Sequence, residues 1–172
     1  MCIRDRRDLC DGCDVNHDFT KTIFDAYLEG RTLITNQADL ADILVQRDIV
    51  MNNWEKVVAA VTVHYVNDVA ADIAGIIASG DTTAMPGSDA TADYENHWGE
   101  MRGYANGLLY NVFKVIEDAN LNRIYAVMGT APVYPTNGNF DDMQAYHDSL
   151  VGEVRAIFQA SYGFSAANVA NW

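Results

Sequence analysis

Residues 40–80 read LADILVQRDIVMNNWEKVVAAVTVHYVNDVAADIAGIIASG, and over most of this stretch apolar side chains recur at intervals of three or four residues. A helix places residues with this spacing on one face. The stretch therefore predicts one long helix before Gly80, or two helices end to end with a break near Arg47–Asp48. The apolar positions are Leu40, Ile43, Leu44, Met51, Trp54, Val58, Val61, Tyr65, Val69, Ile73 and Ile76.

Shorter amphipathic segments precede and follow this stretch. The apolar spacing predicts a helix from Phe19 to Leu28 that Gly30 ends, and Asn36 is expected to cap the long helix. A loop over residues 80–92 then leads into a helix over residues 93–110.

The last third of the chain predicts two more helices. Asn120 is expected to cap a short helix over residues 121–128, and a loop at residues 132–139 precedes a final helix over residues 140–162. Gly163 is expected to end that helix in a left-handed conformation, with Phe164 folding back onto it.

No segment alternates between apolar and polar residues for long enough to predict a strand. About half of the 172 residues are hydrophobic, which is enough for a substantial core. The expected fold is therefore all-α: an antiparallel helix bundle with one long helix and two ordered loops. We assign residues 19–172 to this single domain and expect residues 1–18 to be disordered or artefactual.

The formal net charge of −13 argues against two classes of partner, nucleic acid and anionic lipid. Nucleic-acid binding needs clustered Lys and Arg, and an acidic surface is repelled by anionic lipid as well. The most apolar stretch, residues 57–77, is interrupted by polar residues that include His64 and Asp72. We therefore expect no nucleic-acid partner and no membrane span.

The chain begins MCIRDRRDLCDGCD, which has no apolar region typical of a signal peptide. Met1 to Arg6 resembles a translated sequencing-adapter remnant, so we expect the N-terminal half of a longer protein to be missing. Cys10 and Cys13 form a Cys-x-x-Cys pair without the second pair that a zinc ribbon needs. A local disulfide and a calcium loop at Asp14–Asp18 are alternatives to the unpaired cysteines that we favour.

The helix over residues 93–110 combines two unusual features. Gly99, Gly103 and Gly107 follow one another at intervals of four, and glycine inside a helix costs about 1 kcal/mol relative to alanine. We therefore expect the backbone of a neighbouring helix to approach this stripe closely. His97 and Glu100, one turn apart, share a face and could ligate a metal such as iron or zinc.

His64 is the natural further ligand, because Asp68 lies one turn later and could fix its tautomer. Asp93 and Tyr104 share the helix of His97 and complete the predicted ligand-binding set. The alternative is structural: Glu100 bonds His97 or a neighbouring helix and only fixes packing, and His64 is a buried histidine satisfied by its neighbour Asp68.

Four segments carry a resemblance to a known family: WEKVVAAVTVHYVND, HWGEMRGYANGLLYN, VMGTAP and the closing YGF…NVANW. Together they resemble the bacterial family catalogued as domain of unknown function 4856, over about residues 47–172. The resemblance implies a secreted or lipid-anchored envelope protein. It also implies a link to imelysin-like proteins, helical bundles with a Gly-x-His-x-x-Glu motif and a role in iron or haem acquisition. Glu95 stands here at the glycine position of that motif.

Three functional hypotheses follow. The first is a periplasmic or surface ligand-binding module for iron uptake, which is not an enzyme and binds a metal ion or small ligand through His97, Glu100 and His64. The second is a structural or protein-interaction module without a ligand. The third is a metal-dependent hydrolase, which needs a metal-bound water beside a general base.

Overall fold

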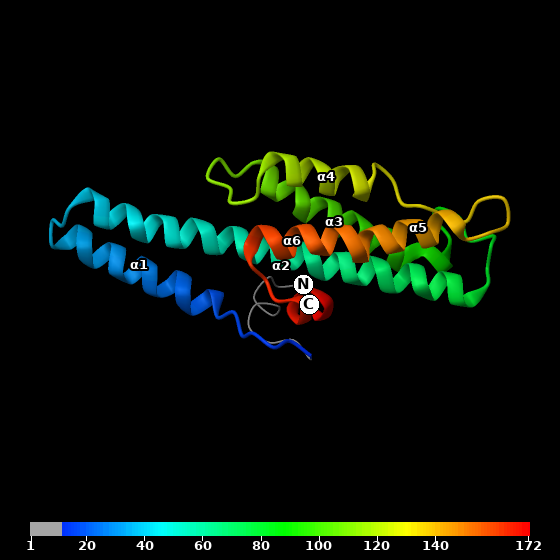
Figure 1. Ribbon diagram of the computed structural model, residues 1–172, viewed down its shortest axis with the longest axis horizontal. Helices are drawn as coiled ribbons and strands as arrows, with labels where there is room; N and C mark the ends of the chain where they lie inside the picture. Colours follow the sequence, from blue (N-terminus) through cyan, green and yellow to red (C-terminus); the bar gives the residue numbers. More distant parts are fainter. Residues whose placement is uncertain (1–11) are drawn as a thin grey trace.

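A single helix, α2, runs from Leu40 to Ser79 without a break and forms the axis of the molecule (Figure 1). The structure, a computed structural model, describes residues 12–172. It confirms the all-α fold, because the described residues contain helices, turns and one isolated β-bridge but no strand. The sequence of residues 40–80 predicted either one long helix or two with a break near Arg47–Asp48, and one continuous helix is correct. It ends at Gly80, whose φ of +72° is the left-handed conformation that glycine adopts most readily.

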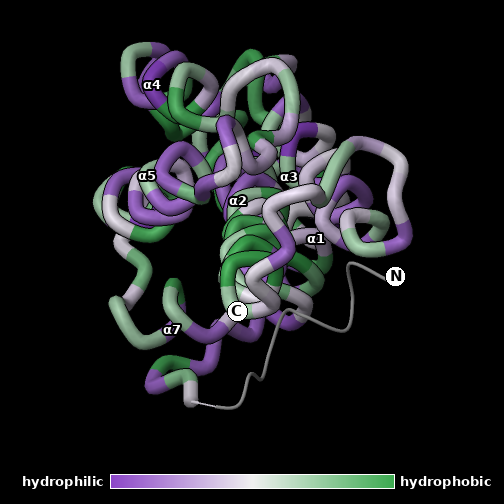
Figure 2. Tube along the Cα trace, turned by 90° about the vertical axis from the view of Figure 1, so that its right-hand side faces the viewer, coloured by the Kyte–Doolittle hydropathy of each residue, from purple (hydrophilic) through white to green (hydrophobic). Residues whose placement is uncertain are grey.

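The middle of α2 is surrounded on every side. All eight consecutive residues from Ala59 to Val66 are buried. A helix of a surface layer buries only one face, so this segment is the core of the bundle. Figure 2 looks along α2 and shows its hydrophobic turns at the centre, with the other helices around it.

The helix α1 (Phe19–Thr35) pairs with the first half of α2 as an antiparallel hairpin (Figure 1). Asp18 caps its start by accepting a 2.8 Å hydrogen bond from the backbone N–H of Lys21. The helix continues through Gly30, so the expected end there is wrong. Asn36 also differs from expectation, because it follows the last turn of α1 and does not cap α2.

The helix α3 (Ala92–Leu109) packs along the second half of α2. It follows the loop over residues 80–91, which contains a short 3₁₀ turn at Asp89–Thr91. The next helix, α4 (Asp118–Met128), lies against α3 and begins three residues before the predicted start. Its cap position is held by Glu117.

The last long helical segment is continuous from Asp141 to Tyr162. It consists of α5 (Asp141–Ser149), a π-helical turn (Leu150–Val154) and α6 (Arg155–Tyr162). Gly163 ends it with a φ of +68°, as predicted, and Phe164 is buried beyond it.

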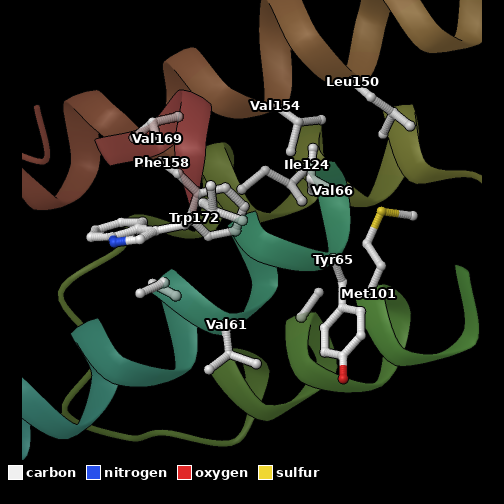
Figure 3. Packing of buried hydrophobic residues seen from close by; sticks show 14 of the residues in the cluster. Val61, Tyr65, Val66, Met101, Ile124, Leu150, Val154, Phe158, Val169 and Trp172 are labelled. Carbon is white, nitrogen blue, oxygen red and sulfur yellow. The ribbon is translucent and has the colours of Figure 1, made fainter. Parts of the chain in front are cut away.

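The short helix α7 (Ala166–Asn171) crosses beneath α2 and was not predicted. Side chains from α2, α3, α4, α7 and the π-helical turn meet in the core (Figure 3). They include Val66, Met101, Ile124, Val169 and Val154.

Residues 12–18 pack against α7. The side chain of Asn168 accepts hydrogen bonds from the backbone N–H groups of Asp14 (3.2 Å) and Val15 (3.1 Å) and donates one to the carbonyl of Val15 (2.7 Å). Residues 1–11 of the segment expected to be disordered or artefactual, Cys10 included, lie outside the described part, and that expectation stays a prediction. Cys13 is disulfide-bonded, which excludes the unpaired state for this cysteine.

By length and composition alone, α2 is a helix that could cross a membrane, contrary to the expectation from its interrupted apolar run. However, 67% of its most apolar window is buried inside the molecule. The core helix of a helical bundle has the same properties, so this is weak evidence for a membrane span.

Candidate functional site

His97 on α3 is paired with Asp72 on α2, and this contact is the centre of the candidate site. The Nδ1 atom of His97 lies 2.7 Å from Oδ2 of Asp72, with both side chains about one quarter exposed. Burial raises the pKa of the Asp72 carboxyl, an effect that the hydrogen bond from His97 partly offsets. Nearby charges on Asp68 and Asp93 raise the same pKa further.

His64 lies on the same side of α2 but is almost fully buried. Its Nε2 atom is 2.8 Å from Oδ2 of Asp68, so the predicted pair exists. Between the two histidines lies Tyr65, whose ring centre is 4.9 Å from that of His64 and 6.1 Å from that of His97. Tyr104 stacks on Tyr65, with ring centres 5.5 Å apart.

The α2–α3 interface therefore brings together five of the six predicted site residues: His64, Asp68, Asp93, His97 and Tyr104. Sequence reasoning missed Asp72, although its place eight residues after His64 puts both on nearby faces of one helix.

Glu100 is the predicted site residue that points elsewhere. It lines an open hollow of about 470 Å³ together with Glu95, Asn96, Gly99, Gly103 and Tyr104. It makes no hydrogen bond or ion pair with any residue in the range 12–172. The structure therefore separates Glu100 from His97, which turns to Asp72.

The glycines of α3 do not allow the close helix approach that we expected. A Cβ atom added to Gly99 or Gly103 would meet no atom within 4 Å, so both face open space. At Gly107 such an atom would lie 3.5 Å from Cγ1 of Val58, which is ordinary contact. Gly99 and Gly103 thus line the surface hollow, and Gly107 alone of the three faces a neighbouring helix.

Within residues 12–172, no three His, Cys, Asp or Glu side chains gather where they could hold a metal ion. His64 has the carboxylate partner that the structural alternative predicted, whereas the partner of His97 is Asp72 and not Glu100. Near the start of the described chain, Asp14 accepts a hydrogen bond from Ser165, and Asp18 caps α1.

A second carboxylate, Glu95, joins two loops to α3. It accepts hydrogen bonds from the backbone N–H of Gly87 (2.7 Å), the hydroxyl of Thr91 (2.9 Å) and the hydroxyl of Tyr134 (2.9 Å). These donors stabilise its charged form and hold the pKa of Glu95 below its usual value. Burial and the bond to Glu95 raise the pKa of Tyr134 to about 12.

Glu55 on α2 is the most completely buried carboxylate among the described residues, at 3% exposure. It accepts hydrogen bonds from the hydroxyl of Tyr162, the side-chain amide of Asn111 and the backbone N–H groups of Val115 and Ile116. A buried charge needs such partners, so Glu55 fastens the loop after α3 to the bundle.

The largest feature that sequence reasoning missed is an exposed apolar surface. Of the fourteen large hydrophobic side chains exposed among residues 12–172, all but Val15 and Met85 belong to residues 24–54 or 109–115. No residue of α2 before Val50 is buried, although Leu40, Ile43 and Leu44 are apolar. Figure 1 shows the reason: α1 is the only helix beside the first turns of α2, and the loop after α3 reaches α2 further along.

This exposed apolar surface contains two open hollows. We call the residues that line the two hollows the hairpin strip. The first, about 430 Å³, lies between α1 and α2, and the second, about 480 Å³, lies between α2 and the loop after α3. Met51 lines both. The guanidinium of Arg47 in the first lies 5.3 Å from the ring centre of Phe113 in the second, which makes the strip continuous. Its principal side chains are Tyr27, Ile34, Ile43, Met51, Trp54 and Phe113.

No family model, curated protein or solved structure matches this chain. The resemblance to the family of unknown function 4856 and to imelysin-like proteins therefore stays a prediction.

Proposed function

We propose that this chain is a non-enzymatic interaction module that binds another protein surface along the hairpin strip. The observation that carries the proposal is the concentration of exposed large apolar side chains on one part of the molecule. Scattered apolar side chains are normal on a protein surface, but contiguous patches are typical of sites that bind another surface.

The geometry of the polar groups supports the same function. The carboxylates of Glu55, Glu95 and Asp72 have partners on neighbouring helices or loops, so they stabilise the bundle. The body is thus a rigid scaffold that presents the strip. Along α2 the strip follows Ile43, Arg47, Met51, Trp54 and Val58, the spacing by which one helix packs against another.

The test uses an uncharged amphipathic helical peptide of about 18 residues, with leucine on one face and glutamine elsewhere. Trp54, which is 46% exposed in the strip, provides the signal. We expect a saturable blue shift of tryptophan fluorescence as the peptide covers Trp54, at a protein concentration of about 0.5 µM that disfavours self-association.

The matched variants separate the strip from general stickiness. Ile34→Glu places a charge in the strip and should weaken peptide binding about tenfold or more. Met85→Glu changes an equally exposed apolar side chain outside the strip, in the loop before α3, and should leave peptide binding unchanged. No saturable shift in the native chain, or equal loss in both variants, would refute the proposal.

A second candidate function is the iron-related ligand binding that the family resemblance implies, in a protein of the cell envelope. The His97–Asp72 pair favours it, because a carboxylate that orients an imidazole is the usual support of a metal-binding histidine. Calorimetric titration with iron and with zinc tests this candidate on the native chain and on His97→Ala. Identical heats for both proteins would remove it.

A further inference from the structure

We infer that the hairpin strip is the interface of a homodimer, in which the α1–α2 hairpins of two copies pack together. This inference rests on the proposed function and names the partner: a second copy of this chain. Two paired helices form a single layer, so no second layer covers the side of the hairpin that carries the strip. Two such hairpins packed strip to strip form a four-helix arrangement that covers it.

The shape of the strip suits pairing with itself. A two-fold interface uses the same patch on both copies, so that patch must carry both projections and hollows. The rings of Trp54 and Phe113 are about half exposed and project from the strip. The hollow between α1 and α2 lies on the same surface, along Gly30, where the helices come close: an added Cβ would lie 3.4 Å from Gln46.

The distribution of charge favours a second copy over other partners. Residues 19–54 contain three basic and five acidic residues, a net charge of −2 out of −13 for the whole chain. A basic partner would be attracted to the remaining −11 charges elsewhere. The hairpin is close to neutral, so it is the part of the surface where two acidic copies repel each other least.

The exposed area of the strip is close to that of a standard interface. A large side chain at half exposure offers on the order of 100 Å². Six exposed side chains line the two hollows and offer on the order of 600 Å², compared with the roughly 800 Å² that each partner contributes to a standard interface. They are Tyr27, Ile34, Trp54, Tyr110, Val112 and Phe113.

Sedimentation equilibrium of the whole chain between about 1 and 100 µM tests the inference, because contacts of this size associate in that range or below it. We expect twice the chain mass at the upper end. Tyr27→Glu and Trp54→Glu should each weaken dimerisation about tenfold or more, since each would bury a charge. Met85→Glu is the control and should dimerise as the native chain does. Unchanged circular-dichroism melting curves show that the variants remain folded.

A photo-crosslinking residue at Ile34 locates the interface. In a mixture of isotopically labelled and unlabelled chains, crosslinks between labelled and unlabelled hairpins support the homodimer. A monomer at the highest concentration, or a dimer that neither glutamate weakens, would overturn it. If the monomer still binds the amphipathic peptide, only the homodimer fails. If neither the peptide nor a second copy binds, the proposed function fails as well.

Discussion

The hydroxyl of Tyr162 donates a 2.8 Å hydrogen bond to Oε1 of Glu55, which lies 107 positions earlier in the chain. Burial raises the pKa of the Tyr162 hydroxyl, and the adjacent Glu55 carboxylate raises it further, so this hydroxyl remains a donor at neutral pH. The bond connects α6 to α2, and the same carboxylate holds the backbone of residues 115–116. One side chain therefore fixes the relative position of three segments.

The first prediction concerns this carboxylate. Glu55→Gln replaces one acceptor oxygen by an NH₂ group that would face other donors, and we expect the free energy of unfolding to fall by about 1–3 kcal/mol or more. Urea denaturation at pH 7 measures the change. Glu29→Gln, exposed on α1, is the control and should lie within about 0.5 kcal/mol of the native protein. Equal effects of both substitutions would contradict the assigned role.

The second prediction separates His97 from Glu100. His97→Ala removes the partner of a partly buried carboxylate and should cost about 1 kcal/mol, whereas Glu100→Ala should cost less than about 0.5 kcal/mol. A double-mutant cycle of His97→Ala with Asp72→Ala, followed by thermal unfolding, measures the coupling between the two residues. If Glu100→Ala lowers the melting temperature as much as His97→Ala does, then Glu100 has a structural partner.

The third prediction is a pH dependence that arises from Glu95. Its folded-state pKa lies below the usual 4.5 because Gly87, Thr91 and Tyr134 donate to the ionised form. The folded state therefore binds this proton less readily than the unfolded state, so the carboxylate stabilises the fold above pH 4.5. This contribution is lost as the pH falls through the lowered pKa.

Glu95→Gln tests this dependence. The variant should melt below the native protein at pH 7, and the gap should narrow as the pH falls below 4.5. Glu100→Gln, on the same helix, should stay close to the native melting temperature. A gap between Glu95→Gln and the native protein that is constant from pH 7 to acid conditions would exclude the mechanism.

The fourth prediction concerns the glycines of α3. Alanine at Gly99 or Gly103 meets open space and removes the helix cost of glycine, so each substitution should stabilise the protein by about 0.5–1 kcal/mol. Gly163→Ala should instead destabilise it, because the φ of +68° strains a side-chain-bearing residue. Chemical denaturation compares the three variants. Loss of stability in Gly99→Ala would indicate a close neighbour at this stripe.

Local patterns explain which parts of the fold were predictable. The apolar spacing of α2, the loop before α3 and the stop at Gly163 depend on neighbouring residues, and each appears as expected. Gly30 misled the boundary of α1, because packing against α2 outweighs the modest cost of one glycine. The α7 helix is too short for a periodic pattern to reveal it.

In the candidate site, too, contacts within one helix were predictable and contacts between helices were not. The pairing of His64 with Asp68 was predictable because both residues lie on one helix. The partner of His97 depends on how α3 is rotated against α2. The spacing of His97 and Glu100 along α3 does not show that Asp72 on α2 will lie next to His97. The exposed start of α2, before Val50, was equally unpredictable, because the apolar spacing of this helix is the same where it is buried and where it is exposed.

The middle of α2 is surrounded by other helices, whereas its start is packed against α1 alone. We therefore expect the two parts of this helix to unfold with different cooperativity. We expect amide hydrogens over residues 57–73 to exchange only when the whole bundle opens, and those over residues 40–49 to exchange more readily because a single neighbouring helix protects them. The hairpin should therefore open at a lower free energy than the body. A ligand on it would slow exchange there first, before any change in the global unfolding midpoint.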